Sequence, residues 1–258
     1  MTRAATAWFL IAMVGQLAFV AFILGYYGTR TVVGDFPAWN DKPVITGYIA
    51  GDALGNLMFI AHVMLAAVVT LGGLAQLIPA IRQRAPALHR WNGRIFLSVA
   101  MFMGVGGLWL IWVRGTQLSL VSSLPTSING LLIVLFAVLA WRDALARQFA
   151  RHRRNAMRAF MVVAGVWFFR VGIMGWLILN QGPVGMTDDM SGPADISLAY
   201  GSYLIPLAIL ELYFIAQRKK DAAWNFIAIS VLVLATLFTA VGVFGTTTMM
   251  WWPYLSAV

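Results

Sequence analysis

Cysteine is absent from this chain of 258 residues, and charged residues are scarce. The lack of cysteine excludes disulfide bonds, thiolate metal sites, iron–sulfur clusters and cysteine nucleophiles. Only 10% of the residues are Asp, Glu, Lys or Arg. The sequence has no phosphate-binding glycine-rich loop, no nucleophile elbow and no pair of histidines at metal-ligand spacing on one helix. It therefore carries no signature of a soluble enzyme.

Apolar residues make up 61% of the chain, and the mean hydropathy is +0.82. Soluble domains contain about 45–50% apolar residues. An uncharged run of about twenty residues is long enough to cross a hydrocarbon layer about 30 Å thick as one helix. We therefore predict one all-α domain, a polytopic transmembrane helix bundle of about seven spans. The spans are expected near residues 7–27, 54–81, 93–113, 128–141, 158–180, 198–217 and 224–245.

The basic residues lie at alternate corners between these spans. Fourteen of the eighteen fall on one side: Arg3, Arg82, Arg84, Arg90, Arg94, Arg142, Arg147, Arg151, Arg153, Arg154, Arg158, Arg218, Lys219 and Lys220. Cytoplasmic loops are enriched in Lys and Arg, so we predict a cytoplasmic N-terminus, an outer C-terminus and a bacterial cytoplasmic (inner) membrane location. The net charge of +9 then indicates contact with anionic lipid headgroups, and we expect no nucleic-acid partner.

A short motif occurs twice. His89-Arg90-Trp91-Asn92 opens the predicted third span, and His152-Arg153-Arg154-Asn155 opens the fifth. The echo is consistent with a parallel repeat of spans two–three and four–five about an axis along the membrane normal. Alternatively, Asn92 and Asn155 are helix N-caps in ordinary basic corners.

The same residues carry a family resemblance. The chain resembles the bacterial domain-of-unknown-function 2306 family of predicted membrane proteins between about Asn56 and Val171. The resemblance rests on His62, Gly72, Gln76, Leu88-His89-Arg90, Gly93-Arg94, His152-Arg153, Met157-Arg158 and Arg170. It implies a polytopic membrane protein and no settled activity.

Arg170 and Glu211 are ionisable residues inside predicted spans. A charge in the bilayer is costly unless it is paired or hydrated, so such residues mark paired or functional sites. The rise of 1.5 Å per residue and the lean of helical side chains toward the N-terminus would bring these two together if spans five and six are neighbours. We therefore expect an Arg170–Glu211 pair, which either fixes packing or lines a path for a solute or protons.

The three histidines provide candidate ligands. His62, with Met58 one turn earlier, is either a packing residue or a ligand of haem iron or Cu(I). His89 and His152 lie at equivalent points of the echoed motif and would hold one haem b between them, with propionates paired to Arg90, Arg94, Arg153 and Arg158. The alternative is that both are interfacial residues in a patch that contacts anionic lipid.

Three functions remain open. The first is a redox protein with one haem b near the cytoplasmic face. The second is a transporter of a small solute or protons that uses Arg170, Glu211 and His62. The third is an accessory subunit that packs against a larger membrane complex or another copy of this chain.

Overall fold

The chain folds into helices only, over the residues described in this computed structural model, which are 2–42, 46–116 and 119–256. The main helices are α1 (Thr2–Phe22), α3 (Ala53–Leu77), α5 (Pro86–Trp112), α6 (Leu120–Leu145), α7 (Phe149–Val163), α8 (Gly165–Asn180), α9 (Pro193–Lys219) and α10 (Ala222–Gly245). The shorter ones are η1 (Ile23–Gly28), α2 (Thr29–Val33), η2 (Pro37–Asn40), α4 (Pro79–Arg84), η3 (Thr246–Trp251) and α11 (Trp252–Leu255). The predicted all-α polytopic bundle is confirmed.

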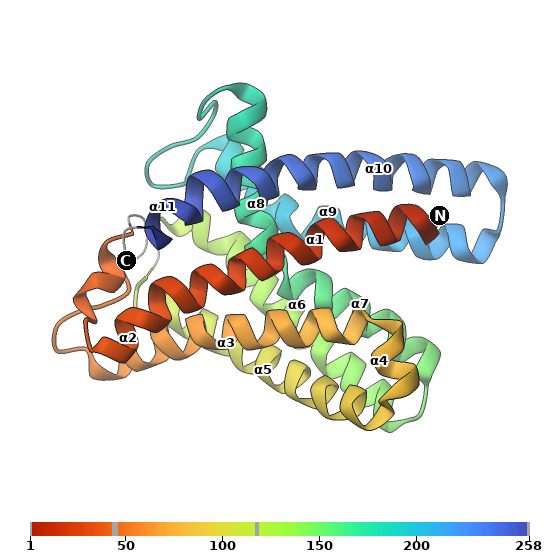
Figure 1. Cartoon of the computed structure of the whole chain (residues 1–258), viewed down its shortest axis with the longest axis horizontal. Coiled ribbons are helices and arrows are strands. Elements are labelled where there is room, and N and C mark those ends of the chain that lie inside the picture. Colours follow the sequence, from red (N-terminus) through yellow and green to blue (C-terminus); the bar gives the residue numbers. More distant parts are fainter. Residues whose placement is uncertain (1, 43–45, 117–118, 257–258) are drawn as a thin grey trace.

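Two groups of helices make up the bundle. In one, α3 packs on α5, α5 on α6 and α6 on α7, so that neighbours in sequence are neighbours in space. In the other, α10 packs on α1 and α8, and α8 packs on α9. Figure 1 shows the first group along the lower side of the molecule and α1 and α10 along the upper side. Contacts of α1 with α3, and of α9 with α6 and α7, join the two groups.

Local sequence signals explain where the long helices begin. Asp52 caps α3 by accepting a hydrogen bond from Gly55 N at 2.9 Å, and Asp221 caps α10 by accepting one from Ala223 N at 2.6 Å. A carboxylate at this position satisfies a backbone N–H that has no partner within the helix. Proline begins α4, α5 and α9, where its missing N–H costs nothing.

Six helices, or helices continued by short ones, are long and apolar enough to cross a membrane among the described residues. A seventh candidate span is the pair α7 and α8, which are bent by 51° at the break between them and would form either a broken span or a re-entrant loop. The predicted fifth span, residues 158–180, therefore starts too late and is not straight. The predicted fourth span, residues 128–141, is also too short, since α6 runs from Leu120 to Leu145.

The basic corners gather at one end of the bundle. Figure 1 shows the N-terminus, α4 and the turn between α9 and α10 at the same end, and α2, α11 and the C-terminus at the other. We call these the basic end and the far end. This arrangement follows the predicted alternation of corners, while the assignment of the basic end to the cytoplasm stays a prediction.

Asn92 and Asn155 are not N-caps, because α5 begins at Pro86 and α7 at Phe149. Each instead hydrogen-bonds to the preceding long helix. Asn92 Nδ2 donates to Gly72 O at 2.8 Å, and Asn155 Nδ2 donates to Asp143 Oδ2 at 2.7 Å. The echoed motif thus makes corresponding contacts in the α3–α5 and α6–α7 hairpins, and the symmetry axis between the hairpins stays a prediction.

Candidate functional site

A cavity of about 660 Å³ lies inside the bundle, lined by residues of α1, α3, α5, α6, α8 and α9. Its walls are mainly apolar, and its volume falls within the range of about 300–1,000 Å³ typical of small-molecule sites. Loop residues from the far end, Lys42, Thr116 and Met190, also line it. Toward the basic end the lining includes Phe96 and Phe160. The cavity therefore extends from the far-end loops into the middle of the bundle.

Two cations face this apolar cavity, Arg170 of α8 and Lys42 of the loop after α2. Arg170 donates a hydrogen bond from Nη1 to Val166 O at 3.0 Å, and its Cζ lies 5.3 Å from the centre of the Phe19 ring. Lys42 Nζ lies 5.3 Å from the centre of the Phe22 ring. Within the part of the chain that the structure describes, neither cation forms an ion pair. Both charges thus remain available to an anion.

Lys42 lies outside the spans, and burial is the main reason that its pKa falls from 10.5 to about 7. The positive charge of Arg170 acts in the same direction. A low-dielectric environment disfavours an ammonium ion, and a nearby like charge disfavours it further. The Lys42 amine is therefore set to gain or lose its proton near neutral pH.

The break between α7 and α8 lies at the cavity wall, where Ala164, Gly165 and Val166 are exposed to the cavity. Ala164 has φ −73° and ψ −2°, which departs from the α-helix. Irregular backbone at membrane depth is tolerated where it lines a cavity or is buried in protein. The break turns the first residues of the 16-residue helix α8 toward the cavity. A helix N-terminus carries partial positive charge and favours anions.

Five uncharged polar side chains line the cavity with an atom that is buried and has no hydrogen-bond partner among the described residues. These atoms are Gln16 Nε2, His62 Nδ1, Asn129 Oδ1, Trp167 Nε1 and Tyr203 Oη. Unsatisfied buried polar atoms are rare in native proteins and each calls for an explanation. Three of the five can only donate or carry a hydroxyl that donates. A ligand rich in acceptor oxygens would give partners to the three donors, which belong to Gln16, Trp167 and Tyr203.

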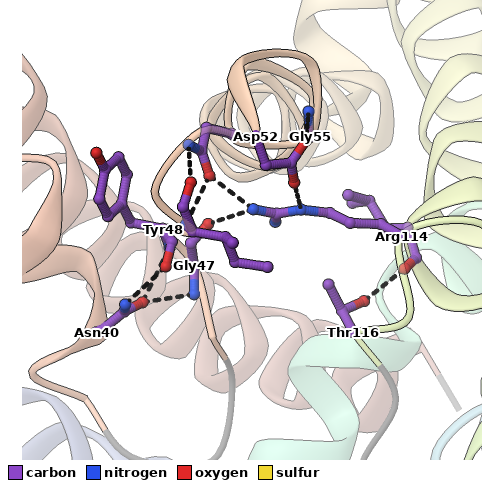
Figure 2. A network of polar contacts seen from close by, with 10 residues as sticks. Asn40, Gly47, Tyr48, Asp52, Gly55, Arg114 and Thr116 are labelled. Carbon is purple, nitrogen blue, oxygen red and sulfur yellow. Dashed lines mark hydrogen bonds and ion pairs between the residues drawn. The ribbon is translucent and has the colours of Figure 1, made fainter.

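The loop that contributes Lys42 is held by Asn40. Figure 2 shows this side chain beside Gly47 and Tyr48, later in the same loop. Its Oδ1 accepts hydrogen bonds from Gly47 N at 2.7 Å and Tyr48 N at 2.9 Å. Its Nδ2 donates to Tyr48 O at 2.8 Å. Trp39, only 2% exposed, anchors the same loop against Phe59. Trp39 and Asn40, which precede Lys42 in the chain, are therefore both held in place.

Arg114 fastens this loop to the start of α3. Its Nε donates to Asp52 Oδ2 at 2.8 Å, and its Nη2 donates to Gly47 O at 2.9 Å and to Asn56 Oδ1 at 2.7 Å (Figure 2). The hydrogen bond from Arg114 is the main cause that lowers the pKa of Asp52 below its usual value. Charge-assisted bonds of this kind are stronger than neutral ones.

The expected Arg170–Glu211 pair does not form. Glu211 Oε1 instead accepts a hydrogen bond from Arg158 Nε at 2.6 Å, which joins α9 to α7. Arg170 lies across the α7–α8 bend from Arg158 and faces the central cavity. Of the three residues in the predicted solute path, the structure brings Arg170 and His62 to the same cavity, and Glu211 is not part of its lining.

His62 lies beside the glycines of α5, where a Cβ on Gly106 would be 4.0 Å from His62 Nδ1 and 3.8 Å from Met58 Cε. The two predicted ligands are thus neighbours on one face of α3. The described residues contain no group of three or more His, Cys, Asp or Glu side chains that could hold a metal ion. The ligand role of His62 and Met58 stays a prediction.

His89 and His152 lie close enough for the charge of one ring to affect the other. His152 Nδ1 donates to Ala140 O at 2.8 Å, and His89 Nδ1 is buried without a partner among the described residues. The four arginines predicted beside them divide in two. Arg158 is engaged with Glu211, whereas the other three, Arg90, Arg94 and Arg153, are exposed.

Sequence reasoning missed Lys42, Gln16 and Asn129. Lys42 is not among the fourteen cations of the basic corners, and neither Gln16 nor Asn129 was predicted as a site residue. The available signal was polarity, since each amide stands in an otherwise apolar run. Helical position alone does not show that such residues face one cavity.

The long apolar helices and their exposed apolar side chains define a polytopic α-helical membrane protein with an internal cavity. A model of the family described as "Predicted membrane protein (DUF2306)" matches residues 59–214, which is more than half of the chain. The chain belongs to this family. No curated protein matches it significantly, and neither does any solved structure.

Proposed function

We propose that this protein is a membrane transporter for organic anions that have an apolar body. The observation that carries the proposal is the presence of two unpaired cations, Arg170 and Lys42, in a cavity whose walls are mainly apolar. A buried charge without a partner is costly. An anionic ligand would offset that cost, while the apolar walls would hold the rest of the ligand.

The shape of the cavity supports transport as well as binding. The lining includes residues of the far-end loops, so one part of the cavity lies at that end of the bundle. Toward the basic end Phe96 and Phe160 both lie beside Gly73 of α3, since a Cβ on Gly73 would be 3.0 Å from a carbon atom of each ring. Transporters commonly place the binding site near a broken helix and open it to each side in turn. In this proposal the two rings separate when the cavity opens to the basic end.

The test is flux of permanently charged probes into liposomes that contain the full chain. Naphthalene-2-sulfonate, decyl sulfate and 1-naphthyl phosphate combine an anionic head with an apolar body, and 2-naphthalenemethanol is the neutral control. We expect uptake of at least one anion above protein-free liposomes, and a loss of about tenfold or more in Arg170→Met. The matched control Arg82→Met removes an exposed arginine at the basic end and should retain uptake. Uptake of none of the three anions, or equal uptake by the Arg170 variant, would overturn the proposal.

One observation favours a second candidate, a haem b held by His89 and His152. An imidazole that binds a metal through one ring nitrogen usually donates the other N–H to a carbonyl or carboxylate. His152 makes such a bond, from Nδ1 to Ala140 O at 2.8 Å. This leaves its Nε2 free to act as a ligand. In this candidate His89 of α5, which lies close enough for the charge of His152 to affect it, would supply the second axial imidazole.

An optical spectrum of protein expressed with ample haem tests the second candidate. A bis-imidazole haem would give a Soret band that is lost in both His89→Ala and His152→Ala and kept in His62→Ala. Absence of the band in the purified wild type, or its loss in the His62 variant alone, would remove this candidate. Neither result bears on anion uptake, so the two candidates fail separately.

A further inference from the structure

A second hollow, of about 310 Å³, lies at the basic end between α6 and α7. It is lined by Leu139, Asn155 and four arginines, Arg142, Arg151, Arg154 and Arg158. Three of these arginines come from α7 at positions that recur every three or four residues, so they share one face of that helix. The central cavity has a different lining, and the hollow is therefore a separate site.

Two carboxylates meet these four arginines. Asp143, whose side chain is 2% exposed, lies 3.6 Å from Arg142 Nη2 and 3.9 Å from Arg151 Nε. Glu211 is paired with Arg158. Four guanidinium groups against two carboxylates leave a surplus of positive charge at the hollow.

The guanidinium donors are only partly used. The separations of 3.6 and 3.9 Å at Asp143 are longer than a hydrogen bond. Within the described part of the chain, Arg154 forms neither an ion pair nor a hydrogen bond. Arg142 and Arg154 thus present planar arrays of N–H donors, which match the oxygens of a phosphate group.

The surroundings of the hollow are those of a membrane interface. The turn between α6 and α7 exposes two large apolar side chains, Leu145 at 75% and Phe149 at 68%. The side chains of Arg142 and Arg151, 60% and 53% exposed, combine charge with access from outside. An amphipathic molecule with a phosphate head and acyl chains would satisfy both features, and basic pockets between membrane helices bind such headgroups.

We propose that this hollow is a specific site for the phosphate headgroup of an anionic phospholipid. Arg142 and Arg154 bind the phosphate oxygens. Asp143 is fixed by the hydrogen bond from Asn155 Nδ2 at 2.7 Å. Its negative charge attracts Arg142 and Arg151 to the rim of the hollow, and it uses none of their N–H groups because the separations are too long for hydrogen bonds. The acyl chains lie along the apolar surface beside Leu139. This inference is independent of the function proposed for the central cavity.

The test is native mass spectrometry of the full chain released from nanodiscs that contain equal amounts of phosphatidylglycerol and phosphatidylcholine. We expect the wild type to retain phosphatidylglycerol over phosphatidylcholine. Arg142→Gln/Arg154→Gln should lower this preference by about tenfold or more, and Arg154→Gln alone should lower it in part. The matched control Arg82→Gln/Arg84→Gln removes the same charge from exposed positions on α4 and should change the preference less than about twofold. Because Arg154 forms no hydrogen bond or ion pair among the described residues, its single variant reports on binding even if the double variant is unstable.

A second arm separates a lipid headgroup from free phosphate. Inorganic phosphate, added at constant ionic strength against chloride, should neither stabilise the protein against heat nor displace the bound lipid at low millimolar concentration. Stabilisation by inorganic phosphate that disappears in the double variant, without lipid preference, would overturn the lipid assignment. Equal loss of preference in the hollow and control variants would also overturn it, because the attraction would then belong to the whole basic end.

Discussion

Arg158 Nε donates a hydrogen bond to Glu211 Oε1 across 2.6 Å and so joins α7 to α9. Arg158 Nη1 also donates to Asn155 Oδ1 at 2.8 Å, and Asn155 in turn contacts the buried carboxylate of Asp143. A chain of polar contacts therefore runs from α6 through α7 to α9 near the basic end. It ties the first group of helices to the second at a point separate from the central cavity.

Arg158 and Glu211 should show energetic coupling, whereas Arg170 and Glu211 should not. The side chains of Arg158 and Glu211 are 25% and 44% exposed, so solvent weakens the pair, and we expect a coupling free energy of about 1 kcal/mol or less. The measurement is a double-mutant cycle with Arg158→Gln and Glu211→Gln, followed by chemical unfolding in mixed micelles. The matched cycle with Arg170→Gln should be additive. Coupling in the second cycle and additivity in the first would restore the pairing expected from the sequence.

Acid should weaken the far-end network through Asp52. The Arg114 hydrogen bond holds the pKa of Asp52 below its usual value. A carboxyl group with a depressed folded-state pKa adds stability above its unfolded pKa of about 3.9, and this stability is lost as the pH falls through the folded-state pKa. The difference in melting temperature between wild type and Asp52→Asn should therefore be constant from pH 7 to about 5 and shrink below about 4.

The control for this measurement is Asp35→Asn, because the Asp35 side chain is exposed and forms no ion pair among the described residues. Its melting temperature should follow that of the wild type at every pH. The ionised form of Asp52 would add nothing to stability if the difference in melting temperature between the wild type and Asp52→Asn stayed unchanged down to pH 3.

Anion binding should weaken as the pH rises through neutrality because of Lys42. Its pKa of about 7 means that the ammonium form dominates at pH 6 and the neutral amine at pH 8.5. Arg170, the other cation that lines the cavity, contributes to this low pKa. Naphthalene-2-sulfonate keeps its charge over this range, so any change belongs to the protein. We expect the Kd to rise roughly tenfold, which corresponds to about 1.4 kcal/mol. The Lys42→Met variant should bind the sulfonate more weakly at pH 6, and its Kd should not change with pH. The Lys219→Met variant, altered at the basic end, should keep the pH dependence of the wild type.

Gly242 should tolerate no side chain. A Cβ at this position of α10 would collide with the carbonyl oxygen of Val171 in α8, and small residues are what allow membrane helices to approach closely. We expect Gly242→Ala to lower the free energy of unfolding by about 1–3 kcal/mol. Gly28→Ala is the matched control, since the nearest atoms to its Cβ would be 4.0 Å away and alanine favours helix. Equal melting temperatures for the two variants would argue against the close contact of α8 and α10.

The spans and the gathering of basic corners could be predicted because both depend on local composition. The pairing of Glu211 could not. The fifth span was predicted as one helix from residue 158 to 180. In the structure α7 begins at Phe149, and α8, which carries Arg170, is bent by 51° from α7. Helical rise gives depth, but the bend decides which neighbour a side chain faces.

The candidate site was predictable in part. Arg170, Glu211 and His62 were expected to share one path for a solute or protons, and of these three Arg170 and His62 line the central cavity. Lys42 could not be placed in the same way, because it belongs to a loop without helical periodicity. The loop contains Asn40 and Gly47, which are hydrogen-bonded to each other, and Gly47 is held by Arg114, which is distant in the sequence.

The central claim is that Arg170 binds the anionic group of a ligand inside the bundle. Isothermal titration calorimetry of naphthalene-2-sulfonate against the protein in zwitterionic nanodiscs at pH 6 tests it most directly. We predict saturable binding that weakens at least about tenfold in Arg170→Met, a melting temperature of that variant no lower than wild type because an unpaired charge is removed, and no effect on 2-naphthalenemethanol. Equal affinity of wild type and Arg170→Met for the sulfonate would contradict the account.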